Sequence, residues 1–280
     1  MTSNKKRLLI VMLLLLALIL PGLDQRLTVV HYAIDAEGFT NPVRVALVTD
    51  LHSCAYGLEQ RALIDALDAE APDCVMLVGD IFDDKLADDN TEAFLAGIAS
   101  RYPCWYVTGN HEYWSGAAAF ARKMAILEKL NIPRLENAAV EVELNGQRVT
   151  LCGVDDPRAW SNDAAVYAAQ LRELAGTESY TVLLAHRPEY AELYAECGFD
   201  LVLSGHAHGG QWRVPGLLNG LFAPNQGLFP KYTGGVYQIE DTTMVVSRGL
   251  ARESTRVPRF YNRPELVIVE LRQHRTENEA

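Results

Sequence analysis

The chain has 280 residues, of which 49% are hydrophobic, so it can bury the core of one large catalytic domain. Its formal net charge is −11 at pH 7. Proteins that hold nucleic acid on their surface need clustered Lys and Arg, so this charge argues against a nucleic-acid surface. If the chain handles phosphate, metal ions must supply the positive charge locally.

Residues 1–23 have the features of a membrane anchor or a secretory signal. Three basic residues at 5–7 precede an unbroken apolar run at 8–20. A helix of this length spans roughly 20 Å, less than the roughly 30 Å hydrocarbon core of a bilayer, which favours a signal peptide. No clear small-x-small site precedes Asp24, so an uncleaved membrane anchor is an equally good interpretation. The basic flank predicts a cytoplasmic N-terminus and a translocated, extracytoplasmic catalytic domain.

A connector at 24–42 should lead into a catalytic domain at 43–272, followed by a polar tail at 273–280. Short β-branched runs alternate with helical patterns in the first half of this domain. Strands are predicted at Val43 to Thr49, Cys74 to Val78 and Trp105 to Thr108, and helices at Leu58 to Ala69 and Ala117 to Leu130. This alternation indicates an α/β sheet.

Antiparallel strands enter in the middle of the chain. The runs Val140 to Leu144 and Gln147 to Val154 flank Asn145-Gly146, a dipeptide that favours a two-residue hairpin turn. Helices are then predicted at 164–175 and 188–196, and strands at 181–185, 201–203, 236–239, 243–247 and 265–271. Residues 209–235 are rich in glycine and lack any period, so we expect a long loop, which in compact domains is usually functional or mobile.

Side chains that can bind metal follow most of the predicted strands. The first three strands lead into D-L-H at 50–52, G-D at 79–80 and G-N-H-E at 109–112. Two later strands lead into His186 and into G-H-A-H at 205–208. Each segment alone has an ordinary explanation as a turn, a helix cap or a core histidine. Open α/β sheets bind ligands at the carboxyl ends of their strands, so together the five segments predict one crevice.

These motifs, in this order, resemble those of the calcineurin-like metallophosphoesterases from about Val43 to the last strand. The chain looks most similar to the bacterial membrane-anchored phosphodiesterase branch. The reason is that G-H-A-H-G-G-Q at 205–211 is followed by A-P-N-Q-G at 223–227 and K-Y-T-G-G at 231–235. The resemblance implies an α/β fold, a four-layer sandwich of two mixed β-sheets flanked by helices, with metals at one edge.

The resemblance also implies a role for each motif residue. The implied ligands are Asp50, His52 and His208 for a first metal, Asn110, His186 and His206 for a second, and Asp80 bridging both. His111 corresponds to the catalytic histidine of the family, which is not a ligand. Gly79 and Gly109 would leave room for tight turns at the metals.

Carboxylate, imidazole and amide ligands without thiolate suit Mn²⁺, Fe, Zn²⁺ or Co²⁺ and argue against an all-oxygen Ca²⁺ or Mg²⁺ cage. We expect two divalent metal ions per chain, with manganese favoured. A water shared by two cations becomes a hydroxide near neutral pH and can attack phosphorus, while His111 would protonate the departing oxygen. The expected activity is therefore that of a binuclear phosphoesterase acting on a phosphodiester, a pyrophosphate or a phosphomonoester.

Several alternatives stay open at this point. Asp83 and Glu112 could orient ligand imidazoles, although Asp83 could equally lie in a solvated turn, and Arg187 could contact the substrate phosphate. The phosphate loop, the nucleophile elbow and the H-E-x-x-H helix are missing. A catalytically silent metal-binding scaffold or sensor with the same fold is the rival function, and an activity assay would separate the two. No oligomeric state is indicated.

The anchor suggests a substrate at or near the membrane. A lipid-linked phosphodiester or pyrophosphate is one such substrate, and the loop at 209–235 could then act as a hydrophobic lid. The alternative is that the apolar side chains of this loop simply pack onto the sheet.

Overall fold

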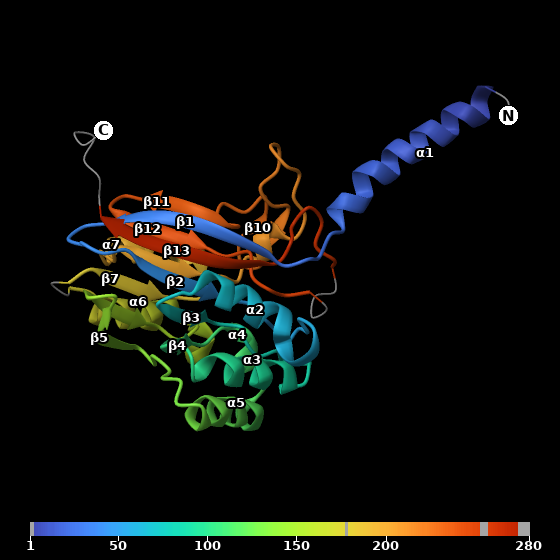
Figure 1. The fold of residues 1–280 in the computed structure, drawn as a ribbon. Coiled ribbons are helices and arrows are strands. Elements are labelled where there is room, and N and C mark those ends of the chain that lie inside the picture. The colour runs from blue at the N-terminus through green and yellow to red at the C-terminus, as the bar shows by residue number, and fades with distance from the viewer. Residues whose placement is uncertain (1–2, 177–178, 253–256, 274–280) are drawn as a thin grey trace.

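A computed structural model describes residues 3–176, 179–252 and 257–273 of the chain. The predicted polar tail therefore lies outside the described residues from 274 onward. Two β-sheets dominate the fold (Figure 1). The first has the strand order β1-β13-β2-β3-β4, and the second has the order β11-β12-β8-β7-β6-β5.

The first sheet consists of β1 (Thr28–Ala36), β13 (Glu265–Gln273), β2 (Val43–Val48), β3 (Cys74–Val78) and β4 (Cys104–Val107). β13 runs antiparallel to β2, and the other neighbours are parallel, so the sheet is mixed. Side chains of β2 alternate between its two faces. Val45 and Leu47 pack between the sheets, whereas Ala46 and Val48 face the helices.

The second sheet consists of β11 (Gly235–Ile239), β12 (Thr242–Val246), β8 (Leu201–Ser204), β7 (Thr181–Leu184), β6 (Gln147–Gly153) and β5 (Ala138–Leu144). It is also mixed, because antiparallel pairs flank the parallel strands β12, β8, β7 and β6. The predicted hairpin is confirmed: Asn145 and Gly146 connect β5 to β6 with φ of 46° and 76°, as a tight hairpin turn requires.

Helices complete the four layers. The outer face of the first sheet is covered by α2 (Arg61–Glu70), α3 (Asp89–Ala99) and α5 (Ala117–Lys129), and that of the second by α6 (Ala164–Leu174) and α7 (Ala191–Glu196). The short elements are η1 (Leu58–Gln60), α4 (Asn110–Trp114), η2 (Pro157–Trp160), η3 (Pro188–Tyr190), η4 (His208–Gly210), β9 (Phe222–Ala223) and β10 (Gly227–Leu228). A third apolar cluster lies between the sheets. The expected four-layer sandwich is thus confirmed.

The segment 24–42, expected to be a connector, is instead part of the first sheet. β1 lies within it and pairs in parallel with β13, from Thr28 opposite Glu265 to Ala36 opposite Gln273. The predicted connector therefore contains an edge strand of the first sheet. β1 is an edge strand whose apolar run is interrupted by exposed His31 and Asp35, so it lacks the continuous pattern of a buried strand.

The N-terminal helix α1 (Ser3–Gly22) extends away from the two sheets (Figure 1). Its C-terminal end is tied to the body, because the amide of Tyr261 donates to the carbonyl of Gly22 at 2.7 Å. The ring of Phe260 packs so closely on Gly22 that a side chain there would overlap it. Across the described part of the chain, no helix combines the length and the hydropathy that a membrane crossing requires.

Candidate metal centre

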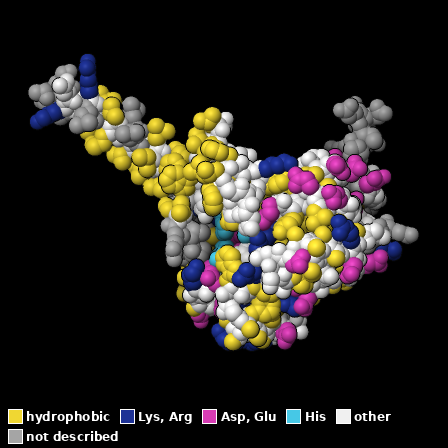
Figure 2. All heavy atoms as spheres, turned by 180° about the vertical axis from the view of Figure 1, so that it is seen from behind, with side chains coloured by type: hydrophobic (Ala, Val, Ile, Leu, Met, Phe, Trp, Pro, Cys, Tyr) yellow, Lys and Arg dark blue, Asp and Glu magenta, His cyan; other side chains and the backbone are white. Residues whose placement is uncertain are grey.

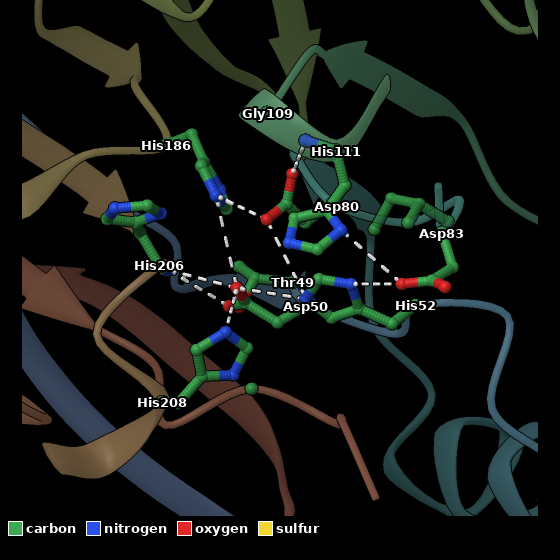
Figure 3. Close-up of polar contacts among 12 residues, drawn as sticks. Thr49, Asp50, His52, Asp80, Asp83, Gly109, His111, His186, His206 and His208 are labelled. Carbon is green, nitrogen blue, oxygen red and sulfur yellow. Dashed lines mark hydrogen bonds and ion pairs between the residues drawn. The ribbon is translucent and has the colours of Figure 1, made fainter. Parts of the chain in front are cut away.

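The predicted site residues follow the strands of both sheets, and seven of the eight, all but Asn110, are seen to come together in Figure 3. Asp50 and His52 follow β2, Asp80 follows β3, Asn110 and His111 begin α4 after β4, His186 follows β7, and His206 and His208 follow β8. All of them are buried except His111, which is partly exposed. Segments far apart in the sequence thus form one polar site at the edge of an apolar core.

Two groups of potential ligands form this site. Asp50, His52 and His208 each offer one ligand atom within 4.8 Å of the others, and so do Asp80, His186 and His206. Asp80 lies between the groups, since its Oδ2 is 3.1 Å from His186 Nε2 and 3.6 Å from His52 Nε2. The spacing matches the two predicted ligand sets, with Asp80 able to serve both.

The atoms that face one another in this site lack hydrogen-bond partners. Within the described residues, these buried unpartnered atoms include His52 Nε2, Asp80 Oδ2, Asn110 Oδ1, His186 Nε2 and His206 Nδ1. A buried polar atom without a partner costs about 1–3 kcal/mol, and such atoms are rare in folded proteins. Lone-pair donors of this kind, gathered at one place, fit divalent cations, which would satisfy them.

Protonation supports the same conclusion. Burial alone would raise the pKa of Asp80, but His186 and His111 hold it well below its usual range, so the carboxylate is ionised. Burial lowers the pKa of His206 and of His208, which keeps both imidazoles neutral, as metal ligands must be. His186 differs: burial opposes protonation, but Asp80 and Asp50 raise its pKa to about 10, so a bound cation would displace its proton.

The main chain at the site is strained. Asp50, His52, Asp80, His206 and His208 all have φ between 47° and 64°, in the left-handed region that residues with side chains rarely adopt. Such positions cost on the order of 1–3 kcal/mol each and tend to gather at functional sites. The two glycines expected to leave room do so, because a Cβ at Gly79 would overlap His186 and one at Gly109 would overlap Asp80.

Two of the histidines have their outward ring nitrogen held by the first sheet or its loops. His52 Nδ1 lies 3.1 Å from Asp83 Oδ1, so Asp83 orients an imidazole as the sequence suggested. His186 Nδ1 lies 2.9 Å from the carbonyl of Val78, at the end of β3. In both rings this contact leaves Nε2 free to face the centre, which is how proteins fix the tautomer of a metal-binding histidine.

Glu112 has a different role from the expected one. Its carboxylate contacts no imidazole and instead accepts hydrogen bonds from the amides of Asp80, Phe82 and Gly109 at 3.1, 3.1 and 2.8 Å. The hydroxyl of Tyr106 also donates to it at 2.7 Å. Glu112 therefore joins the turn after β3 to the turn after β4, and it acts on the site through the main chain.

Arg187 was a candidate contact for the substrate phosphate. The structure buries it and pairs it with Asp156, with Nε 2.6 Å from Oδ2 and Nη2 3.0 Å from Oδ1. Its guanidinium is thus engaged in a bidentate ion pair inside the protein, and this pair supports the segment that carries His186.

His111 lies beside the two ligand groups and is held at two points. Its main-chain amide donates to Asp80 Oδ1 at 2.8 Å, and its ring Nδ1 lies 2.7 Å from Asp84 Oδ1. Burial alone would lower the pKa of His111, but Asp80, Asp83 and Asp84 raise it to about 9. Cations bound in the site would act against these carboxylates and lower that pKa again.

Two contacts to the histidines that follow β8 come from residues to which the sequence assigned no role, although Asn225 lies in the A-P-N-Q-G segment at 223–227. Asn225 Oδ1 lies 3.0 Å from His206 Nε2, and the side-chain amide of Asn262 donates to the carbonyl of His208 at 2.7 Å. Both asparagines are distant in sequence and lie in irregular segments. No periodic pattern or spacing rule points to such positions.

Exposed apolar side chains surround the opening of the site. Figure 2 shows histidine side chains in a hollow beside a group of hydrophobic side chains, next to α1. The exposed large apolar residues of the 209–235 loop are Trp212, Val214, Leu217, Phe222, Leu228 and Phe229. Leu218 and Leu221 of the same loop are partly buried, so the loop combines packed and exposed apolar side chains.

Two mixed sheets in four layers, with aspartate and histidine side chains gathered at the strand ends, define a candidate metal-binding site on an α/β sandwich. A family model described as calcineurin-like phosphoesterase matches residues 43–210, which is more than half of the chain. The chain belongs to this family.

Individual relatives agree with this assignment. The chain is 30% identical over 228 residues to "Transmembrane protein with metallophosphoesterase domain" of Bos taurus, covering 75% of this chain and 49% of the relative. It is 32% identical over 177 residues to "Uncharacterized metallophosphoesterase Cj0846" of Campylobacter jejuni, covering 60% and 45%. It is 27% identical over 246 residues to "Phosphodiesterase YaeI" of Escherichia coli, covering 82% of each chain. The chain thus spans about half the length of the first two relatives.

Proposed function

We propose that the chain is a phosphoesterase that uses two divalent cations, with Mn²⁺ as the favoured ion, to hydrolyse a phosphodiester. The observation that carries this proposal is that buried atoms without partners occur on His52, Asp80, His186 and His206, whose side chains are grouped closely enough to share metal ions. Asp50, His52 and His208 would hold one ion; Asn110, His186 and His206 would hold the other; Asp80 would contact both.

Two cations held in this way would lower the pKa of a water molecule and neutralise charge on the phosphoryl group. The chain itself supplies the proton. Because Asp84 engages Nδ1 of His111, the other ring nitrogen is available to give a proton to the departing oxygen. Against the effect of burial, Asp83 and Asp84 beside the ring raise the pKa of His111 and so favour the protonated form that a general acid needs, although bound cations would oppose them.

A diester is favoured over a monoester by one comparison: the E. coli relative that aligns over most of both chains carries the name phosphodiesterase. The direct test is hydrolysis of bis(p-nitrophenyl) phosphate by the full chain with Mn²⁺ and with a chelator. Turnover that needs the metal supports the proposal. Two bound ions per chain without turnover of this or any other phosphoester would favour the silent scaffold instead.

We also propose that the enzyme works at a lipid surface, on a membrane-associated phosphoester. Leu18 and Leu20 of α1 are exposed, as are Phe222 and Phe229 of the 209–235 loop. Figure 2 shows hydrophobic side chains along the projecting helix and on the body of the protein beside its base. Apolar surface of this extent usually marks an interaction site. The basic flank at 5–7 favours a cytoplasmic N-terminus, so the catalytic domain would lie outside the cytoplasm.

Co-sedimentation with phospholipid vesicles tests the lipid surface separately from catalysis. The full chain should sediment with the vesicles, and a chain that lacks residues 1–22 should do so less, since it loses the apolar side chains of α1. Equal sedimentation of the two chains would remove α1 from the proposed contact, and no sedimentation of either would reject the lipid surface. The p-nitrophenyl assay should be unaffected by this truncation.

A further inference from the structure

The four histidines of the centre are not supported equally. The rings of His52 and His186 are held by Asp83 and by the carbonyl of Val78, which belong to the first sheet and its loops. His206 and His208 lack such support from a neighbouring strand. After β8 the chain passes into η4, which begins at His208, and then into the 209–235 loop. Their orientation therefore depends on residues that return to the site from elsewhere.

Asn225 provides this support for the ring of His206. Its Oδ1 lies 3.0 Å from Nε2, so the imidazole donates from Nε2 and keeps a lone pair on Nδ1. Nδ1 is the buried ring atom that lacks a partner, and it is therefore the atom that faces the centre. Asn225 lies in the turn between β9 and β10, with φ of 61°, and its own side chain is exposed.

Asn262 provides the corresponding support for the main chain of His208. Its amide donates to the carbonyl of His208 at 2.7 Å and to that of Gln211 at 3.1 Å, across η4. It is fully buried, and a Cβ on Gly209 would collide with it, so its position relative to the turn is fixed. The next residues back along the chain, Phe260 and Tyr261, hold the end of α1.

We infer that Asn225 and Asn262 are positioning residues for the metal centre, one for each ion. This inference rests on the proposed two-cation function. Asn225 fixes the tautomer of His206 and so serves the ion held with Asn110 and His186. Asn262 fixes the turn that carries His208 and so serves the ion held with Asp50 and His52. Neither residue touches the reacting atoms.

The same substitution at the two positions should give opposite results. Asn225→Asp keeps an acceptor of the same size opposite Nε2, so Mn²⁺ affinity should be equal to or tighter than that of the wild type. Asn262→Asp removes the donor and places oxygen against two carbonyl oxygens, so affinity for one of the two ions should fall about 10- to 100-fold. Asn225→Leu, which has no acceptor, should weaken the other ion by about 10-fold or more.

Calorimetric titration of Mn²⁺ into the metal-free full chain measures these affinities without any substrate. Asn162→Asp, on an exposed turn outside the site, is the matched control and should bind as the wild type does. Thermal unfolding of each metal-free variant shows whether it is folded. If Asn262→Asp does not fold, Asn262→Ser, which keeps a smaller donor, should weaken one ion by a smaller factor.

Two outcomes would overturn the positioning roles. One is equal Mn²⁺ affinity in Asn225→Asp and Asn262→Asp, and the other is wild-type affinity in both Asn225→Leu and Asn262→Ser. These results are separable from failure of the proposed function. A wild-type chain that binds Mn²⁺ twice but hydrolyses nothing leaves the positioning roles standing, whereas a wild-type chain that binds no Mn²⁺ rejects both.

Discussion

The first sheet and the second sheet contribute to the metal centre in different ways. Residues after β2, β3 and β4 are supported by the segments that follow the same three strands, since Asp83 holds His52 and Glu112 holds the turns of Asp80 and Gly109. Residues after β8 are supported by Asn225 and Asn262, which lie in irregular segments further along the chain. One half of the centre is therefore built locally, and the other is completed by long-range contacts.

Asp80, which we propose contacts both ions, lies between the two ligand groups, so its loss should have the largest effect. Asp80→Asn removes the negative charge that both ligand groups share, while the shape of the side chain is kept. We expect both ions and all phosphoesterase activity to be lost, with metal content measured by atomic emission after dialysis. Asp241→Asn, on an exposed turn, should retain metal and activity. Two ions still bound to Asp80→Asn would show that the halves are independent.

Loss of His111 should separate chemistry from metal binding. His111 is not among the proposed ligands and its ring Nδ1 is engaged by Asp84, so His111→Ala should keep both ions. Turnover of an aryl phosphodiester should fall by about 10²- to 10⁴-fold, which is the usual contribution of a general acid. His31→Ala is the matched control, because it removes an exposed histidine away from the site and should leave kcat unchanged. A fully active His111→Ala would exclude this residue from the mechanism.

The contrast between the halves also explains what the sequence could predict. The buried strands and the convergence of the motifs were predictable because β-branched runs mark such strands, and because parallel strands end at one edge of a sheet. The four-layer arrangement was predicted only from the resemblance of the motifs to a known family. β1 was missed because His31 and Asp35 interrupt the pattern of an edge strand. Helix α3 was not predicted at all.

Supports of the site were predictable only where they lie beside a ligand in the sequence. Asp83 was identified as a partner for an imidazole because it follows Asp80 by three residues. Glu112 was predicted to support an imidazole, but it accepts hydrogen bonds from main-chain amides instead. Such bonds cannot be predicted from the spacing of side chains in the sequence. Asn225 and Asn262 were missed, because an asparagine in a loop is ordinarily a turn residue.

Removal of the Glu112 carboxylate should weaken the locally built half by a moderate amount. In the wild type, both oxygens of the Glu112 carboxylate accept hydrogen bonds from main-chain amides. Glu112→Gln replaces one oxygen with an NH₂ group, which cannot accept, so at least one buried amide loses its acceptor. This should lower the free energy of unfolding by about 1–3 kcal/mol. Urea unfolding of the metal-free chain measures the change, and Glu173→Gln, which lies exposed on α6, is the matched control. An unchanged unfolding midpoint would mean that the two turns hold without this bridge.

The smallest effect is expected at the tip of the loop that completes the second half. Leu217 is 86% exposed and contributes nothing to the core, so Leu217→Ser should change the free energy of unfolding by less than about 0.5 kcal/mol. Mn²⁺ affinity should also stay at the wild-type value, although vesicle binding should fall because apolar surface is lost. A drop in Mn²⁺ affinity on replacing Leu217 would mean that the loop supports the metals as a unit. If Leu217→Ser keeps the wild-type Mn²⁺ affinity and Asn225→Leu loses affinity, the loop supports the metals through the side chain of Asn225.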